Sequence, residues 1–134
     1  QGANPAVALK NVIKLANWIE KDTWPQILAA FARCVRITRD LTEVYKVNPK
    51  ELSMDEEKAL LTCAENAEKE IHAKRTVDTL LNQVEEMTAD INTFFENVLV
   101  MDKDPKAKHN RLAILQKIAA LSVGLADLSQ LEGF

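Results

Sequence analysis

Apolar residues recur at steps of three and four from Val77 to Val98, and this pattern constrains the fold more than any other part of the chain. Such spacing places the apolar side chains on one face of an α-helix of about six turns. Thr76 precedes the stretch and can accept one of the first free backbone N–H groups, so the helix is expected either to begin directly after it or to run on from the preceding helix with a bend near Arg75. The residues on this face are Val77, Leu80, Leu81, Val84, Met87, Thr88, Ile91, Phe94, Phe95 and Val98.

Other segments of the chain also have helical spacing, and the composition agrees with them. With 3 glycines and 4 prolines in 134 residues, the chain is poor in the residues that build turns, so we predict an all-α fold, a helical bundle of about five helices. The other helices are expected from about Pro5 to Lys21, from Trp24, from Ser53 with Glu56 at capping-box spacing, and from about Ala107 to Asp127. The last one is apolar over so wide an arc that we expect it at the centre of the bundle.

The length of the chain fits one domain, so we predict a single helical domain over residues 1–134. The segment 41–52, interrupted by Pro49, is the only candidate boundary. It would divide an N-terminal helix pair, residues 5–40, from a C-terminal helical unit, residues 53–131. The opening letters QGANP lack an initiator Met, whereas LEGF resembles a natural end, so we expect an excised fragment or a processed product.

No arrangement of residues in the sequence points to catalysis or to a bound metal. His72 and His109 lie far apart, and neither has a second ligand at the spacing that a metal site needs. The three glycines are too scattered to form a phosphate-binding loop. Cys34 and Cys63 fall on apolar helical faces, so we expect two reduced core thiols. We therefore predict no catalytic residue, no metal site and no cofactor in this chain, and no membrane span.

A site for RNA would have to be local, because the net charge of −3 and the pI near 5.4 give the whole surface no nucleic-acid signature. One local group of cations is the stripe Arg33, Arg36 and Arg39, which Tyr45 and Lys46 extend. Arginine binds phosphates and stacks on unpaired bases, the two tasks that RNA recognition requires. The simpler interpretation is a solvated helix face whose charge nearby carboxylates neutralise.

The second group lies at the turn into the last helix. A helix N-terminus there would offer free backbone N–H groups to a phosphate. The simpler interpretation is a lysine-rich loop that only keeps the chain in solution. This group comprises Lys103, Lys106, Lys108, His109, Asn110 and Arg111.

Several stretches of the chain resemble one known family. They read ILAAFARCVRI, VNPKELSMDEEKAL, INTFFENVLVM followed by NRLAILQKIAAL, and GLADLSQL, and together they cover most of residues 27–131. They are similar to the anticodon-binding domain at the C-terminus of glycyl-tRNA synthetase β subunits of the bacterial and plastid type, which is related to the DALR domain of arginyl-tRNA synthetases. Arg33 matches a basic position of that family, and Asn110 and Arg111 lie in its NRL motif. CVRI departs from the Asn-containing segment usual there.

The resemblance implies a DALR-like, non-catalytic domain of a glycine–tRNA ligase that contacts the anticodon region of glycine tRNA. Glycylation itself, with ATP and Mg²⁺, would take place in the α subunit or catalytic domain of the same enzyme. The implied partners are glycine tRNA and that subunit, not DNA or a membrane, in the bacterial cytoplasm or in a plastid or other organelle. The candidate RNA-binding residues are Arg33, Arg36, Arg39, Lys46, Lys106, Lys108, Asn110 and Arg111.

Two alternatives remain open at the level of sequence. The negative net charge and the abundance of Leu and Ala also suit a helical module that docks on other proteins. The arginyl type of the same domain is the other alternative, although it usually ends in a Pro- and Met-containing motif that is absent here.

Overall fold

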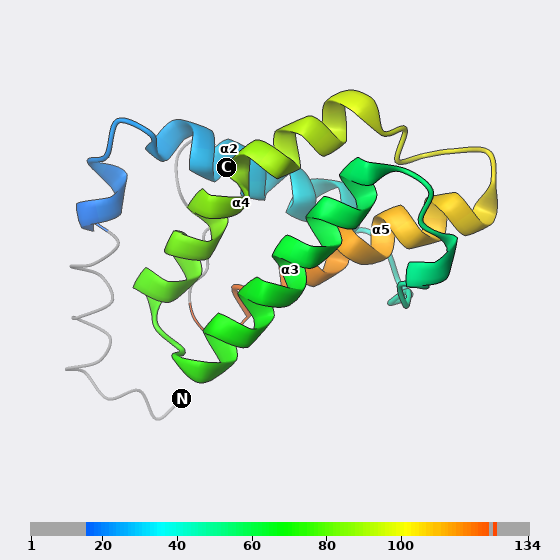
Figure 1. Ribbon diagram of the computed structural model, residues 1–134. Helices are drawn as coiled ribbons and strands as arrows, with labels where there is room; N and C mark the ends of the chain where they lie inside the picture. Colours follow the sequence, from blue (N-terminus) through cyan, green and yellow to red (C-terminus); the bar gives the residue numbers. More distant parts are fainter. Residues whose placement is uncertain (1–15, 124, 126–134) are drawn as a thin grey trace.

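The structure is a computed structural model that describes residues 16–123 and residue 125. All regular structure in this part is helical, which confirms the predicted all-α fold (Figure 1). The predicted first helix lies mostly outside the described residues, and residues 16–19 of it are helical. The elements are α2 (Trp24–Thr38), the 3-10 helix η1 (Pro49–Glu51), α3 (Asp55–Ala73), α4 (Val77–Asn97) and α5 (Pro105–Ala120).

Side-chain caps fix where α4 and α5 begin. α4 begins directly after Thr76, the first of the two expected arrangements, and the Thr76 hydroxyl accepts a backbone N–H one turn further on at 3.1 Å. α5 begins at Pro105, because the Asp104 carboxylate accepts the Lys106 N–H at 3.1 Å. The predicted start at Ala107 was therefore late. Proline suits the first position of a helix, where its missing N–H is not needed.

α3 begins one residue later than a cap at Ser53 would place it. The helix begins at Asp55, and Glu57 rather than Glu56 closes the cap. The Glu57 carboxylate accepts the backbone N–H groups of Ser53 at 3.2 Å and of Met54 at 2.9 Å. This register turns Glu57 into the protein, where it is only 2% exposed.

The helices form two sets of opposite direction. Thr23 donates its hydroxyl to Glu85, and further along both helices the Arg33 guanidinium lies over the Phe95 ring, so α2 and α4 run parallel. α3 and α4 are joined by the short turn 74–76 and are therefore antiparallel neighbours (Figure 1).

This arrangement brings both long connections to the same end of the bundle. Asn97 at the end of α4 donates to Glu56 at the start of α3, at 3.1 Å. Arg111 of α5 reaches Glu57 in the first turn of α3. We call this region the loop end: the last turn of α2, residues 39–54, residues 98–104 and the first two turns of α5. The opposite end, with residues 74–76, is called the turn end.

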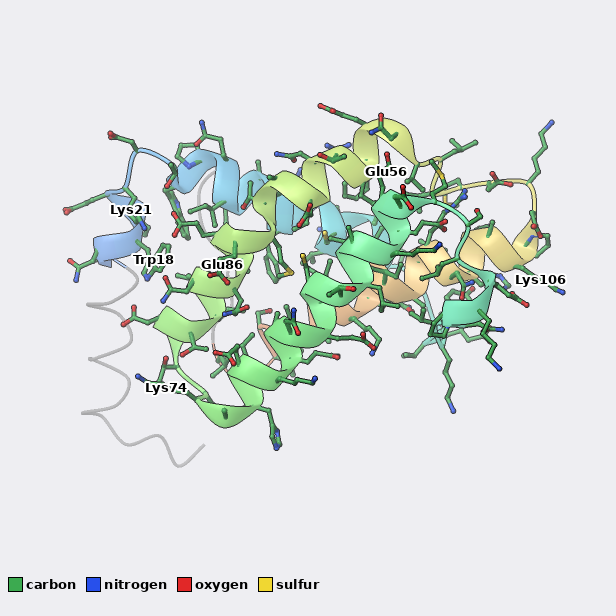
Figure 2. The ribbon with its side chains drawn as sticks, viewed as in Figure 1. Trp18, Lys21, Glu56, Lys74, Glu86 and Lys106 are labelled. Carbon is green, nitrogen blue, oxygen red and sulfur yellow. The ribbon has the colours of Figure 1, made fainter. Side chains whose placement is uncertain are left out.

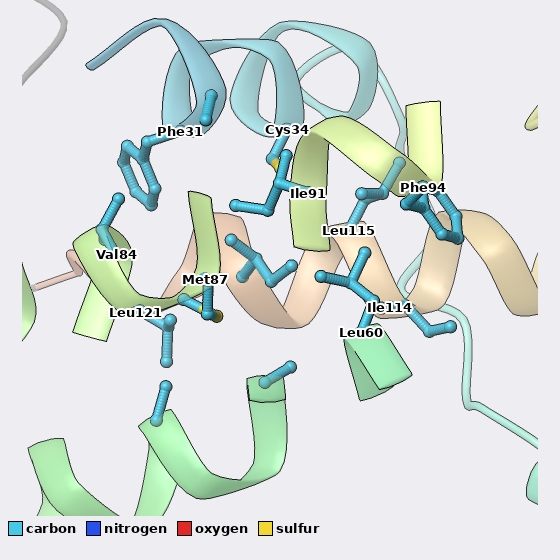
Figure 3. Close-up of a cluster of buried hydrophobic side chains, with 14 of the residues drawn as sticks. Phe31, Cys34, Leu60, Val84, Met87, Ile91, Phe94, Ile114, Leu115 and Leu121 are labelled. Carbon is cyan, nitrogen blue, oxygen red and sulfur yellow. The ribbon is translucent and has the colours of Figure 1, made fainter. Parts of the chain in front are cut away.

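The core of the described part lies between α2, α3, α4 and α5, and the middle of α5 is buried on all its faces. All residues from 110 to 115 are buried, which is more than one full turn of α5. Figure 3 shows side chains of α2, α4 and α5 meeting there, among them Cys34, Ile91 and Leu115. α5 ends at Ala120, well before the predicted end near Asp127, a residue that lies outside the described part.

The two cysteines are free thiols, as predicted. Cys34 is fully buried, and this burial raises its pKa to about 12. Cys63 is half-buried and donates its thiol hydrogen to Asp90 Oδ2 at 3.0 Å. Burial, together with the Asp90 carboxylate, raises the pKa of Cys63 to about 11. Both thiols therefore stay protonated at neutral pH.

Candidate nucleic-acid interface

The arginine stripe lies on the surface of α2. Arg33, Arg36 and Arg39 are all exposed. The Arg33 guanidinium carbon lies 4.1 Å from the centroid of the Phe95 ring, a cation–π contact that fixes this side chain against α4. Among the described residues, no carboxylate forms an ion pair with any of the three arginines.

The predicted lysines also lie at the loop end. Lys46 is exposed in the segment between α2 and η1, and Lys108 is half-buried in α5. The Lys106 side chain is 77% exposed, with its Nζ 3.9 Å from a carboxylate oxygen of Glu51, a distance at which the ion pair is weak. Figure 2 shows Lys106 at the loop end of the molecule. Lys50 in η1 is a further exposed cation here, which the sequence analysis did not single out.

Asn110 lies inside the protein rather than on its surface, since it is 4% exposed. Its Oδ1 accepts the backbone N–H of Asn48 at 2.8 Å, and its Nδ2 donates to the Asn48 carbonyl at 3.3 Å. Gln116 makes a similar pair of bonds to the same segment. It accepts the N–H of Tyr45 at 2.9 Å and donates to the carbonyl of Glu43 at 2.8 Å. Two amide side chains of α5 thus hold the segment after α2.

Arg111 is also buried, at 6% exposure. Its Nε donates to Glu57 Oε2 at 2.9 Å, and its Nη1 donates to the Leu99 carbonyl at 2.7 Å and to Asp102 Oδ2 at 3.2 Å. The guanidinium is engaged by partners from two segments, α3 and residues 98–104, and is buried from solvent. The prediction that Asn110 and Arg111 contact RNA is therefore corrected, because both side chains organise the interior of the loop end.

The segment after α4 is shaped by the same guanidinium. The Asp104 N–H and the Arg111 guanidinium hold the pKa of Asp102 below its usual range. Arg111 also fixes the carbonyl of Leu99, whose side chain points outward and is 66% exposed. Met101 is 56% exposed. The loop end thus presents apolar side chains beside its cations.

Two aromatic rings from distant parts of the sequence stack at the loop end. The Tyr45 and His109 rings have centroids 4.3 Å apart and an interplanar angle of 10°. In the sequence these two residues fall in separate basic groups. No local signal could have paired them, because one precedes η1 and the other lies in α5.

A groove of about 390 Å³ runs beside this stack, between residues 44–49, α3 and α5. Glu65 and Glu68 line it, and Lys117 lies 3.5 Å from the Glu68 carboxylate. Lys46 lines the groove as well, so two carboxylates face two lysines there, one of which is already paired, and the groove has no excess of positive charge for a phosphate. The exposed cations of the loop end that do not line it, Arg36, Arg39 and Lys106, are the better candidates for a contact with nucleic acid.

The described residues give no sign of other chemistry. Within them, no cluster of three or more His, Cys, Asp or Glu side chains is placed to hold a metal ion. None of the helices in this part of the chain has the length and apolar character needed to cross a membrane.

The all-helical fold agrees with the comparison to protein families. Residues 27–128 match the profile of the DALR anticodon-binding domain. The match covers most of the chain, and the chain belongs to this family.

A second comparison, with individual proteins, finds relatives among glycine–tRNA ligases. The glycine–tRNA ligase β subunit of Thermodesulfovibrio yellowstonii is 36% identical over 114 residues, 83% of this chain and 17% of the relative. The chloroplastic/mitochondrial glycine–tRNA ligase 2 of Arabidopsis thaliana is 29% identical over 136 residues, 100% of this chain and 13% of the relative. The β subunit of Moorella thermoacetica is 31% identical over 130 residues, 94% of this chain and 19% of the relative. The chain therefore spans less than a fifth of the length of these relatives.

Proposed function

We propose that this chain is the non-catalytic anticodon-binding domain of a glycine–tRNA ligase β subunit and that it binds the anticodon region of glycine tRNA. The observation that carries the proposal is the grouping of exposed cations at the loop end. Arg36, Arg39, Lys46 and Lys106 are all exposed there, and Arg33 lies one turn earlier on α2. The family match over residues 27–128 supports the same function.

The charge distribution suits a domain that contributes part of a larger footprint. The net charge of −3 opposes tight, non-specific attachment to RNA. Local arginines and lysines can still bind phosphates, and each such contact makes the affinity depend on salt. Bases in a loop are unstacked and can be read on their edges. Glycine anticodons share two cytosines, which are the expected targets of sequence reading.

Catalysis takes place elsewhere in this proposal. Glycine activation with ATP and Mg²⁺ belongs to the α subunit or to a catalytic domain of the same enzyme, which is the proposed protein partner. The relatives come from bacteria and from a plant organellar enzyme. The proposed compartment is accordingly the bacterial cytoplasm or a plastid or mitochondrion.

A second candidate function, docking on another protein domain, is favoured by one observation. Leu99 and Met101 are large apolar side chains that are 66% and 56% exposed at the loop end. Apolar groups of this kind are typical of a surface that another domain covers. The acidic net charge fits this alternative as well.

Binding to two transcripts separates these functions. One is a glycine tRNA, and the other is the same tRNA with both anticodon cytosines changed, each measured at two salt concentrations. Preference for the unchanged anticodon supports direct reading, and equal, salt-sensitive binding to both supports contacts to the backbone only. No binding to either transcript by the folded chain overturns the proposed function and favours docking.

A further inference from the structure

The stacked rings of Tyr45 and His109 form a flat aromatic surface at the loop end. Their centroids are 4.3 Å apart and their planes differ by 10°, so the rings lie face to face. Tyr45 is half-buried, whereas His109 is exposed. Tyr45 covers one face of the His109 ring, so the stack can grow only at the opposite face. A second flat ring could add to the stack from that side.

Hydrogen bonds from α5 hold the backbone around Tyr45, the inner residue of the stack. The Tyr45 N–H donates to Gln116 Oε1 at 2.9 Å, and the Gln116 amide donates to the carbonyl of Glu43 at 2.8 Å. Asn110 exchanges two hydrogen bonds with the backbone of Asn48. The platform is therefore ordered before any ligand arrives, which lowers the conformational entropy lost on binding.

Exposed cations flank the stack. Lys46 directly follows Tyr45, and Lys106 lies one turn before His109 on α5. RNA-binding proteins stack unpaired bases on aromatic side chains, and they bind the adjoining phosphates with lysine or arginine. An exposed ring backed by a second ring, with lysines beside it, has the chemistry that an unpaired nucleotide requires.

We propose that the open face of His109, backed by Tyr45, is a stacking platform for one unpaired base of the bound anticodon loop. This inference rests on the proposed function and adds the contact site of a single nucleotide to it. Lys46 and Lys106 lie where they can bind the phosphates on either side of that nucleotide. Stacking does not depend on the identity of the base, so the platform contributes affinity and position, and the edge contacts are made by other groups.

The test uses glycine tRNA transcripts that carry the fluorescent base 2-aminopurine at one anticodon-loop position at a time. Binding of the unchanged chain is expected to quench one position strongly. His109→Leu keeps an apolar side chain against Tyr45 but removes the ring, whereas His109→Phe keeps a ring. We expect His109→Leu to lose the quenching and to weaken binding roughly 5- to 100-fold, the range for loss of one base–aromatic stack. His109→Phe should retain both.

His72→Leu is the matched control, because His72 is an exposed histidine of α3 outside the loop end. It should leave affinity and quenching unchanged. Two results would overturn the platform and leave the proposed function intact. One is anticodon-dependent binding that quenches no position, and the other is an affinity of the His109→Leu variant equal to that of the unchanged chain. Absence of binding to every tRNA would overturn both.

Discussion

Glu57 and Arg111 form a buried ion pair, with 2.9 Å between Oε2 and Nε and with only 2% and 8% of the two side chains exposed. The pair joins the first turn of α3 to α5. Through the Leu99 carbonyl it also holds the segment that follows α4. One buried guanidinium therefore ties α3, α5 and the segment after α4 together at the loop end.

The first prediction concerns the stability of this pair. Arg111→Met should lower the free energy of unfolding by about 3–5 kcal/mol, because it leaves the Glu57 carboxylate buried without its partner. Urea unfolding measures the change. The double variant Glu57→Gln, Arg111→Met should lose less than the sum of the two single losses. Arg36→Met, on an exposed arginine, is the control and should stay within about 0.5 kcal/mol. A loss below about 1 kcal/mol for Arg111→Met would contradict this account of the pair.

The second prediction concerns the exposed arginines. If Arg36 and Arg39 each bind one phosphate, Arg36→Ala and Arg39→Ala should each weaken tRNA binding and lower the slope of log affinity against log salt by about 0.7. Titrations at several salt concentrations give the slope. Lys74→Ala is the matched control, because Lys74 is an exposed cation at the turn end. If the salt slopes of the arginine variants equal that of the unchanged chain, Arg36 and Arg39 do not bind phosphates of the tRNA.

The third prediction concerns the amides that hold the segment after α2. Asn110→Ala should speed hydrogen exchange at the Asn48 N–H, and Gln116→Ala should speed exchange at the Tyr45 N–H, since each variant removes the acceptor of that group. Each should also cost about 0.5–1.5 kcal/mol of stability. Amide exchange followed by NMR checks both, and each variant serves as the control for the other. Unchanged exchange at both amides would show that these bonds do not hold the segment.

The fourth prediction follows from the raised pKa values of the two thiols. The thiolate is the reactive form, and it is scarce at about pH 8 when the pKa values are about 12 for Cys34 and about 11 for Cys63. Iodoacetamide should therefore modify neither thiol rapidly in the folded chain. As pH rises, Cys63 should react first because it is half-exposed, and Cys34 should react only on unfolding. Mass spectrometry follows both.

Asp90→Asn sharpens this prediction. It removes the negative charge beside Cys63 and should lower the pKa of that thiol, so Cys63 should react at lower pH than in the unchanged chain. The rate at Cys34 should not change. Alkylation of Cys34 as fast as Cys63 in the folded chain would show that Cys34 is not sealed in the core.

Local sequence signals predicted the elements well, because the determinants of a helix lie within a few residues of it. Thr76 precedes a clean apolar stripe, and α4 begins where that pair of signals places it. The wide apolar arc of the last helix agrees with the burial of every residue from 110 to 115. The predicted cap of α3 was wrong by one residue. Both Glu56 and Glu57 follow Ser53 closely enough for their carboxylates to reach the backbone N–H groups before the helix, and Glu57 does so.

The candidate site was less predictable, because its organisation depends on contacts between distant residues. Arg111 follows lysines and a histidine in a basic stretch, and only its contact with Glu57 shows that it points inward. The stack of Tyr45 on His109 is likewise a product of the tertiary fold. The exposed arginines of α2 were the part of the site that helical periodicity alone could place on the surface.

The central claim is that the anticodon loop binds the loop end, and lysine protection tests it most directly. The chain is acetylated with and without an excess of the anticodon stem-loop of a glycine tRNA, and mass spectrometry compares the rates at each lysine. Figure 2 shows Lys106 and Lys74 at opposite ends of the molecule. The account predicts slower acetylation of Lys46, Lys50 and Lys106 and unchanged rates at Lys69 and Lys74. Protection of Lys74 that equals or exceeds that of Lys106 would contradict it.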